Sequence, residues 1–288
     1  MTELLAYEPR PRRIALPSRG GEIAVLDFGP EDRAVDIVFS HANGFNGRTY
    51  RSILAPLAEG LRILAFDMRG HGLSTLPAEP QALVDWYAYR DDLLALIETV
   101  TTRPVALSGH SMGGAASLLA AAAAPERVKA LVLFDPVFAD PGMVASNGQP
   151  NTLADGAARR RATFPSRDMV IAAYTGRGAF RSWQPQQLAD YVEGGFIDTA
   201  DGEVTLACAP AWEAANFRTH GYDALAAFQA TTCPIHIFRA EHGSTARLDS
   251  YADELKAMGR VIVETVPGTT HFLPMERPDV VQVALAKG

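Results

Sequence analysis

Apolar residues gather along this chain into short continuous runs, and segments with helical periodicity lie between them. In the first half the runs fall at 22–29, 35–41, 62–67, 104–110 and 129–135. An apolar run without polar alternation predicts a strand buried on both faces, as in a parallel sheet. Apolar residues recur at helical spacing in the intervening segments at 48–60, 82–100 and 112–126. The pattern predicts an α/β fold with a doubly wound, mostly parallel sheet.

The alternation breaks after Asp135. From 137 to 220 the sequence shows helical pieces and Gly-containing loops, but no run typical of a buried strand. Strand and helix signals then return, with apolar runs at 234–240 and 260–268. We therefore predict an α/β core made of 1–136 and 221–288, into which 137–220 is inserted as a helical cap, or lid.

Composition and charge narrow the classes of partner. The formal net charge of the 288 residues is -7, and no basic stripe offers itself to phosphates, so we expect no nucleic-acid partner. The densest basic cluster is "ARRR" at 158–161. We expect it to be a solvated helix face, with an anion-binding spot as the alternative.

The sequence also lacks the features typical of membrane insertion and of cofactor binding. The first 13 residues lack the apolar core of a signal peptide, and the longest apolar stretch, 118–124, is too short to span a bilayer. A cytoplasmic protein with no stable membrane insertion is expected. Cys208 and Cys233 lack metal-ligand spacing and are expected to be buried thiols. No metal motif, dinucleotide motif or P-loop appears, so no cofactor and no metal is expected. The oligomeric state stays open.

The clearest chemical motif is "SGHSMGG" at 108–114, which contains G-x-S-x-G around Ser111. It lies between a predicted buried strand and a predicted helix, which is the context that this motif requires. Its glycines allow a sharp strand-to-helix turn that holds the serine in a strained backbone conformation with its hydroxyl exposed. Ser111 is therefore the candidate nucleophile.

Four motifs together resemble the α/β-hydrolase family. Besides the serine motif these are "SHANGF" at 40–45, "FDMRGHGLS" at 66–74 and "GTTHFLPMERPD" at 268–279, in the family's order. The resemblance implies a serine esterase or lipase-like hydrolase with a catalytic triad. It also implies an oxyanion hole made by the backbone N–H groups of Asn43 and Met112. Ala42 stands where the family carries a glycine, and its methyl group is small enough for a working hole.

A serine hydroxyl needs a general base, and the chain offers seven histidines. His271 follows the last predicted strand, in a loop at the carboxyl edge of the sheet, where open α/β sheets bind ligands. His41 and His110 occupy family positions typical of scaffold residues. His271 is the candidate base.

The sequence lacks an acid at the position from which the family usually orients this histidine, and Asp135 is the candidate to replace it. The family commonly places it in a turn after the strand that is here "PIHIF", but Gly243 stands there. Asp135 ends the neighbouring strand, and some family members carry their acid after that strand. Adjacent strands lie only about 4.8 Å apart, so Asp135 is within plausible reach of the loop of His271. Glu241, Asp249 and a bare Ser–His dyad remain as alternatives.

These residues favour a hydrolase that cleaves carboxylic esters of small or medium apolar acyl groups through an acyl-serine intermediate. A small-molecule ester is the expected partner. The alternatives are a ligand-binding or sensing module on the same fold, or a lactone, amide or carbon–carbon bond hydrolase. The predicted cap carries aromatic residues that either roof an apolar pocket or pack the cap's own core: Phe138, Phe164, Tyr174, Phe180, Trp183, Tyr191, Phe196, Trp212 and Phe217.

Overall fold

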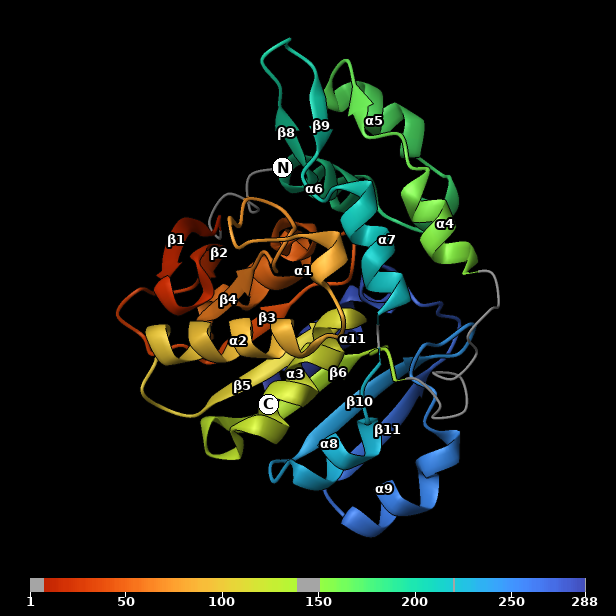
Figure 1. Cartoon of the computed structure of the whole chain (residues 1–288). Helices are drawn as coiled ribbons and strands as arrows, with labels where there is room; N and C mark the ends of the chain where they lie inside the picture. Colours follow the sequence, from red (N-terminus) through yellow and green to blue (C-terminus); the bar gives the residue numbers. More distant parts are fainter. Residues whose placement is uncertain (1–7, 139–150, 220, 288) are drawn as a thin grey trace.

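A computed structural model describes residues 8–138, 151–219 and 221–287 of the chain. Its main element is an eight-stranded sheet with the strand order β1-β2-β4-β3-β5-β6-β10-β11 (Figure 1). β2 pairs with β1 and β4 in antiparallel fashion, and all other neighbours are parallel. The predicted α/β fold with a mostly parallel sheet is confirmed. The strands are β1 (Arg10–Leu16), β2 (Gly21–Phe28), β3 (Ile37–Ser40), β4 (Ile63–Phe66), β5 (Val105–His110), β6 (Val128–Phe134), β10 (Ile235–Ala240) and β11 (Val261–Val266).

The central strands are buried along their whole length, which explains their unbroken apolar runs. Every residue of β3, β4 and β5 is buried. In the parallel register Ser40 at the end of β3 lies opposite Gly109 near the end of β5. Because parallel strands end at one edge of a sheet, the loops that follow β3, β5, β6, β10 and β11 meet there.

Helices cover both faces of the sheet. Buried side chains of α2 (Tyr87–Val100), α3 (Met112–Ala123), α8 (Ala224–Ala230) and α9 (Ala252–Met258) belong to one apolar cluster. Those of α1 (Arg51–Leu54), α10 (Leu273–Glu276) and α11 (Pro278–Lys287) belong to a second cluster. The sheet is thus doubly wound, with an apolar core on each side.

The helix predicted at 48–60 is not continuous. It consists of a 3₁₀ turn at Gly47–Tyr50, the short α1, and a second 3₁₀ segment at Ala55–Glu59. Pro56 lies at the start of that second segment, and a proline inside a helix removes a hydrogen bond and collides with the preceding turn. The apolar periodicity of this segment was sound, but the proline interrupts the helix.

The segment 137–220, which we call the insertion, contains both helices and short strands in its described residues. Its helices are α4 (Thr152–Ala158), α5 (Arg167–Tyr174), α6 (Pro185–Gly195) and α7 (Pro210–Arg218). A small antiparallel sheet of β7 (Thr163–Phe164), β9 (Val204–Leu206) and β8 (Phe196–Asp198) joins them. The expectation that this segment lacks buried strands is therefore wrong, because Phe164, Phe196 and Val204 are buried. Strands of two or three residues are too short to show alternation in a sequence.

The described part of the insertion gathers beyond one end of the large sheet (Figure 1). Cys208, in the insertion, and Cys233, in the core, are buried free thiols. Among the residues that the structure describes, every helix falls short of the length and apolar character that a bilayer span requires.

Candidate active site

Ser111 occupies the sharp turn between β5 and α3. Its φ of 55° and ψ of -120° are unusual for a residue with a side chain. The turn needs glycine on both sides. A Cβ on Gly113 would lie 2.2 Å from the carbonyl oxygen of Ser40, and one on Gly109 would lie 2.5 Å from the carbonyl carbon of Gly113. The G-x-S-x-G pattern therefore follows from close backbone packing under the serine.

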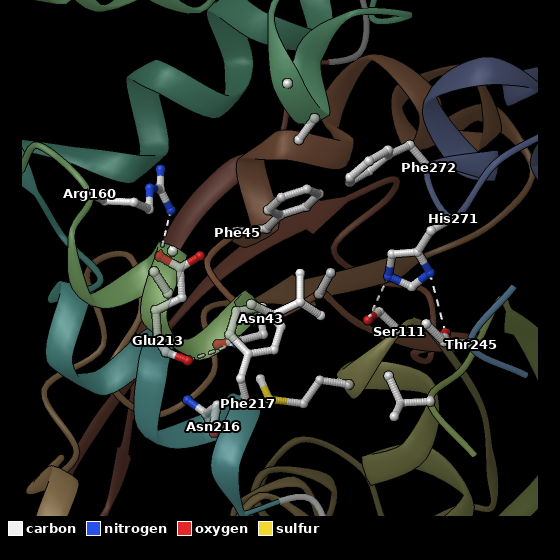
Figure 2. Close-up of a pocket in the computed structure, with 18 of the residues that line it drawn as sticks. Asn43, Phe45, Ser111, Arg160, Glu213, Asn216, Phe217, Thr245, His271 and Phe272 are labelled. Carbon is white, nitrogen blue, oxygen red and sulfur yellow. Dashed lines mark hydrogen bonds and ion pairs between the residues drawn. The ribbon is translucent and has the colours of Figure 1, made fainter. Parts of the chain in front are cut away.

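His271 joins Ser111 to Asp135. Its Nε2 lies 3.0 Å from the hydroxyl oxygen of Ser111, and its Nδ1 lies 2.6 Å from Oδ2 of Asp135. Figure 2 shows the imidazole directly above the serine, with Thr245 beside its other nitrogen. A neutral imidazole that donates from Nδ1 to the carboxylate accepts at Nε2, so the serine hydroxyl can donate to it. The structure thus brings together the three residues that sequence reasoning singled out.

Asp135 sits in the turn after β6, with a positive φ of 39° and no solvent exposure. Its Oδ1 accepts hydrogen bonds from the backbone N–H of Ala240 at 2.8 Å and from the hydroxyl of Ser244 at 2.5 Å. Its Oδ2 accepts from the backbone N–H of Thr245 at 3.0 Å. Burial alone would raise the pKa of Asp135, but His271 and these donors outweigh it and hold the pKa below its ordinary value.

The alternative acids lie elsewhere. Oε2 of Glu241 accepts from the backbone N–H of Gly268 at 2.7 Å. Asp249 pairs with Arg239 at 2.9 Å and is largely exposed. Neither carboxylate has a hydrogen bond with His271 among those of the described residues.

The turn after β10, where the family commonly carries the acid, here donates hydrogen bonds to an acid from another strand. Gly243 carries no carboxylate, but Ser244 and Thr245, which follow it, donate to the carboxylate of Asp135. Sequence reasoning missed both residues. Their only signal is a pair of hydroxyl side chains beside the position where an acid was sought, and such pairs are common in turns.

Asn43 and Met112 both line the cavity next to Ser111. Among the hydrogen bonds of the described residues, neither backbone N–H has a protein acceptor. The side chain of Asn43 points away from the serine and donates from Nδ2 to the backbone carbonyl of Glu213 at 3.0 Å (Figure 2). Both backbone N–H groups are therefore left without a protein acceptor beside the cavity, within the described part of the chain.

Two buried histidines fix the loop that carries Asn43. Nδ1 of His41 donates to the carbonyl of Ala42 at 2.7 Å, and its Nε2 accepts from the backbone N–H of Met68 at 2.9 Å. Nε2 of His71 accepts from the backbone N–H of Gly44 at 3.0 Å. Burial lowers the pKa of His41 well below its ordinary value and that of His71 to about 4, so both rings are neutral near pH 7.

A buried chain of hydrogen bonds links the same loop to His271. The backbone N–H of Ala42 donates to the hydroxyl oxygen of Tyr50 at 3.2 Å, and this hydroxyl lies 2.7 Å from Nδ1 of His110. Nε2 of His110 lies 2.7 Å from the backbone carbonyl of His271, so it carries the proton and Nδ1 accepts from Tyr50. His110 and Tyr50 thereby hold the backbones on both sides of Ser111.

A cavity of about 820 Å³ opens over Ser111, between the strand ends and the insertion. Its walls are mainly apolar and aromatic. Of the aromatic residues predicted in the cap, the cavity is lined by Phe138, Tyr174, Phe180, Tyr191 and Phe217. The others are buried in the apolar clusters: Phe164, Trp183, Phe196 and Trp212. Phe138, Phe180 and Tyr191 line the cavity and also belong to the apolar clusters, so the two expected roles overlap at these residues.

The basic cluster at 158–161 is not simply a solvated helix face. α4 ends at Ala158, and both Arg160 and Arg161 line the cavity. Nη1 of Arg160 lies 2.5 Å from Oε2 of Glu213, in a largely buried ion pair. The expected solvated helix face is therefore wrong for Arg160, because this side chain pairs with Glu213 in the cavity wall. The two residues are 53 positions apart, so no local pattern reveals the pair.

No group of three or more His, Cys, Asp or Glu side chains with metal-binding geometry occurs among the described residues.

The comparisons with known proteins agree with this architecture. The model of the alpha/beta hydrolase family matches residues 37–282. The chain therefore belongs to the alpha/beta hydrolase family, and the resemblance seen in its motifs is confirmed.

One relative and two solved structures match most of the chain. A 2-(acetamidomethylene)succinate hydrolase of Mesorhizobium japonicum is 26% identical over 255 residues, which cover 86% of each chain. The crystal structure of an E-2-(acetamidomethylene)succinate hydrolase superposes with a TM-score of 0.79 at 23% identity, covering 97% of this chain and 98% of the other. A thioesterase domain from the curacin biosynthetic pathway also has a TM-score of 0.79, at 15% identity and 97% and 99% coverage. The two structural likenesses, below 25% identity, show the fold.

Proposed function

We propose that this hydrolase cleaves carboxylic esters through an acyl-serine intermediate, with Ser111, His271 and Asp135 as its catalytic triad. The observation that carries the proposal is the continuous hydrogen-bonded series from the serine hydroxyl through the imidazole to the buried carboxylate. A serine so connected has a base for its proton, and the base has a fixed tautomer.

The reaction starts when the hydroxyl oxygen of Ser111 attacks the ester carbonyl while Nε2 of His271 takes the proton. The carbonyl oxygen becomes an oxyanion, which accepts from the backbone N–H groups of Asn43 and Met112. The imidazolium then gives its proton to the leaving alkoxide, and the acyl group stays on Ser111. Water, deprotonated by His271, attacks this acyl-serine, and collapse of the second tetrahedral intermediate releases the acid and restores the serine.

Asp135 serves this cycle by charge and by position. Its Oδ2 holds the Nδ1 proton of His271, which leaves Nε2 free to act as the base. Its negative charge stabilises the imidazolium that forms in each half of the reaction. The donors from Ala240, Ser244 and Thr245 keep the buried carboxylate ionised and correctly turned.

The cavity favours substrates with a small or medium apolar acyl group. Aromatic side chains from both the core and the insertion form its walls, among them Phe45, Phe272 and Phe180. Burial of apolar area gives about 25 cal/mol per Å², so a longer acyl chain gains affinity until the cavity is filled. We expect kcat/KM to rise with acyl length over a series of p-nitrophenyl esters and then to fall.

Hydrolysis of an amide in an acidic substrate is a second candidate. One relative, matched over 86% of its length, is named for 2-(acetamidomethylene)succinate, a dicarboxylate that carries an amide. Three arginines line the cavity here, Arg160, Arg161 and Arg247, and arginine is well suited to carboxylates. Turnover of amides of dicarboxylic acids, in preference to apolar esters, would favour this candidate.

The role of Ser111 can be tested directly with a fluorophosphonate, which reacts with an activated serine. Mass spectrometry should locate the adduct on Ser111. Ser111→Ala should lose on the order of 10⁴-fold or more in kcat on p-nitrophenyl esters. A protein that binds such esters without steady turnover would instead be a sensing module. An adduct on another residue, or full activity of the variant, would contradict the proposal.

A further inference from the structure

Glu213 is a charged residue in the wall of the cavity that the proposed reaction does not use. It lies on α7 in the insertion and is only 7% exposed. Figure 2 shows it between Arg160 and Asn43, on the far side of Phe45 from His271. A carboxylate is costly to bury, so its surroundings indicate what it does.

Helix α7 is fixed to the core at several points. Nε1 of Trp212 donates to the carbonyl of Arg69 at 3.0 Å. The hydroxyl of Tyr89 donates to Oδ1 of Asn216 at 2.6 Å. The backbone carbonyl of Glu213 itself accepts from the side chain of Asn43 at 3.0 Å. The position of Glu213 relative to the loop of Asn43 is therefore set before any ligand binds.

One oxygen of the Glu213 carboxylate is occupied within the protein. Oε2 accepts from Nη1 of Arg160 at 2.5 Å, and Nη2 of Arg160 donates to the hydroxyl oxygen of Tyr191 at 2.8 Å. Arg160 is thus held at both ends of its guanidinium, and it fixes the direction of the carboxylate. Burial raises the pKa of Tyr191 to about 12, so its hydroxyl stays neutral beside the arginine.

The other oxygen, Oε1, has no hydrogen-bond partner among the described residues. It lies against the loop of Asn43, because a Cβ built on Gly44 would be 2.6 Å from it. It is not among the side-chain atoms that are sealed from solvent without a partner, although Glu213 as a whole is buried. Glu213 itself lines the cavity, which is the route by which a ligand would reach Oε1. An ionised carboxylate oxygen only accepts hydrogen bonds, so a ligand must bring the donor.

We infer that Oε1 of Glu213 is a subsite for a hydrogen-bond donor on the substrate. The substrate class is an ester whose acyl or alcohol part carries a hydroxyl or amide N–H remote from the scissile bond. This inference rests on the proposed function for its place in the reaction, but not for the binding itself. Glu213 is the one acidic residue among the described residues that line the cavity, so such a donor meets a single charged acceptor, which sets its orientation as well as its affinity.

Matched substrates can measure this preference. We would use p-nitrophenyl esters of N-acetylaminoalkanoic acids of increasing length and acetate esters of N-acetylaminoalcohols. Each is paired with its N-methylated analogue, which lacks the N–H. A hydrogen bond to a charged group contributes about 1.5–3 kcal/mol, so the pair that reaches Glu213 should differ about 10- to 100-fold in kcat/KM.

Glu213→Gln provides the test of assignment. The amide oxygen of glutamine can still accept from Arg160, which turns the amide –NH₂ toward the cavity in place of the acceptor. The N–H to N-methyl ratio should then fall to near one. Asp190→Asn is the matched control, because Asp190 is also a buried carboxylate of the insertion, paired with Arg51 at 2.8 Å, but does not line the cavity. Its ratio should equal that of the wild type.

The subsite is overturned if no pair shows the preference, if Glu213→Gln retains it, or if Asp190→Asn loses it equally. Binding separates this outcome from failure of the proposed function. N-hexylacetamide and N-hexyl-N-methylacetamide can be titrated into Ser111→Ala with and without Glu213→Gln. Glu213-dependent preference for the N–H compound supports the subsite even where esters are not turned over, and equal binding of the two contradicts it.

Discussion

The two sides of Ser111 are built on opposite electrostatic arrangements. On the His271 side, an ionised carboxylate, Asp135, gathers donors from the neighbouring turn after β10. On the Asn43 side, His41 and His71 hold the loop by hydrogen bonds while burial keeps them uncharged.

The difference follows from what each side must supply in the proposed reaction. A positive imidazolium forms at His271, so a fixed negative charge beside it lowers the energy of that state. At Asn43 the requirement is a backbone N–H in a fixed direction, which neutral hydrogen bonds provide without adding charge. In the proposed reaction the His271 side therefore depends on a fixed charge, and the Asn43 side depends on a rigid backbone.

Removing the charge at Asp135 should have the largest effect. Asp135→Asn keeps the volume of the side chain but offers an amide to His271, which favours the wrong tautomer and leaves the imidazolium unpaired. We expect kcat to fall about 10⁴-fold with little change in KM. Steady-state kinetics on a p-nitrophenyl ester, with circular dichroism to verify the fold, would measure it.

The rival acids serve as controls for that experiment. Glu241→Gln and Asp249→Asn remove carboxylates that contact other partners, Gly268 and Arg239. Both variants should stay within a few-fold of wild type. An Asp135→Asn enzyme that did likewise would show that the acid lies elsewhere or is absent.

Acidic pH should lower the free energy of unfolding through His71, one of the two uncharged histidines that hold the loop of Asn43. The folded pKa of His71 is about 4, below the ordinary value of 6.5, so between these limits the unfolded chain binds a proton that the folded chain does not. The contribution of His71 to the free energy of unfolding is therefore fully present above pH 6.5 and is lost as the pH falls toward 4. The loss is about 1.4 kcal/mol per pH unit, or about 3 kcal/mol in all.

Urea unfolding at several pH values would measure this slope, with His71→Gln as the comparison. Glutamine can still accept from Gly44 but does not titrate in this range. The variant should have a shallower dependence of unfolding free energy on pH, and other titrating groups cancel in the difference. Equal slopes for the two proteins would mean that His71 is already protonated in the fold, or remains neutral in both states.

Removing one of the hydrogen bonds to Asp135 should have the smallest effect of these changes. Ser244→Ala removes one hydrogen bond to Oδ1 while the N–H groups of Ala240 and Thr245 remain. We expect kcat to fall about 10-fold, which corresponds to about 1.4 kcal/mol. Ser182→Ala removes a similar hydroxyl donor from the half-buried carboxylate of Glu276, which keeps both of its hydrogen bonds from Thr270, and should leave kcat unchanged. A Ser244→Ala enzyme as fast as this control would mean that the other donors suffice.

The residues that the sequence could predict are those tied to a local pattern. Unbroken apolar runs predict the buried strands, and the glycines that a tight turn requires indicate Ser111. Asp135 could be selected because it directly follows such a strand. His271 could be selected because its loop follows the last strand, β11, although most of that strand is exposed. The three-stranded sheet of the insertion could not, since two or three residues carry no period.

Contacts between distant segments were also beyond sequence reasoning. Arg160 and Glu213 each resemble an ordinary polar position on a helix or at its end, and only the fold makes them a buried pair lining the cavity. The donors Ser244 and Thr245 were hidden for a related reason. In the family this turn commonly supplies a carboxylate, whereas here it binds the carboxylate of Asp135, which follows another strand.

The root of the insertion has a consequence for building chimeric hydrolases. The chain passes from Asp135 into the insertion within three residues, and these residues are tied to the core. The backbone N–H of Val137 donates to the carbonyl of Ser111 at 3.2 Å, and that of Phe138 to the carbonyl of Thr245 at 3.0 Å. On the return side, the hydroxyl of Tyr222 donates to the carbonyl of Val137. A donor segment from another family member should therefore be spliced in after Phe138 and before Tyr222, because an earlier junction would also exchange residues that are hydrogen-bonded to the proposed catalytic site.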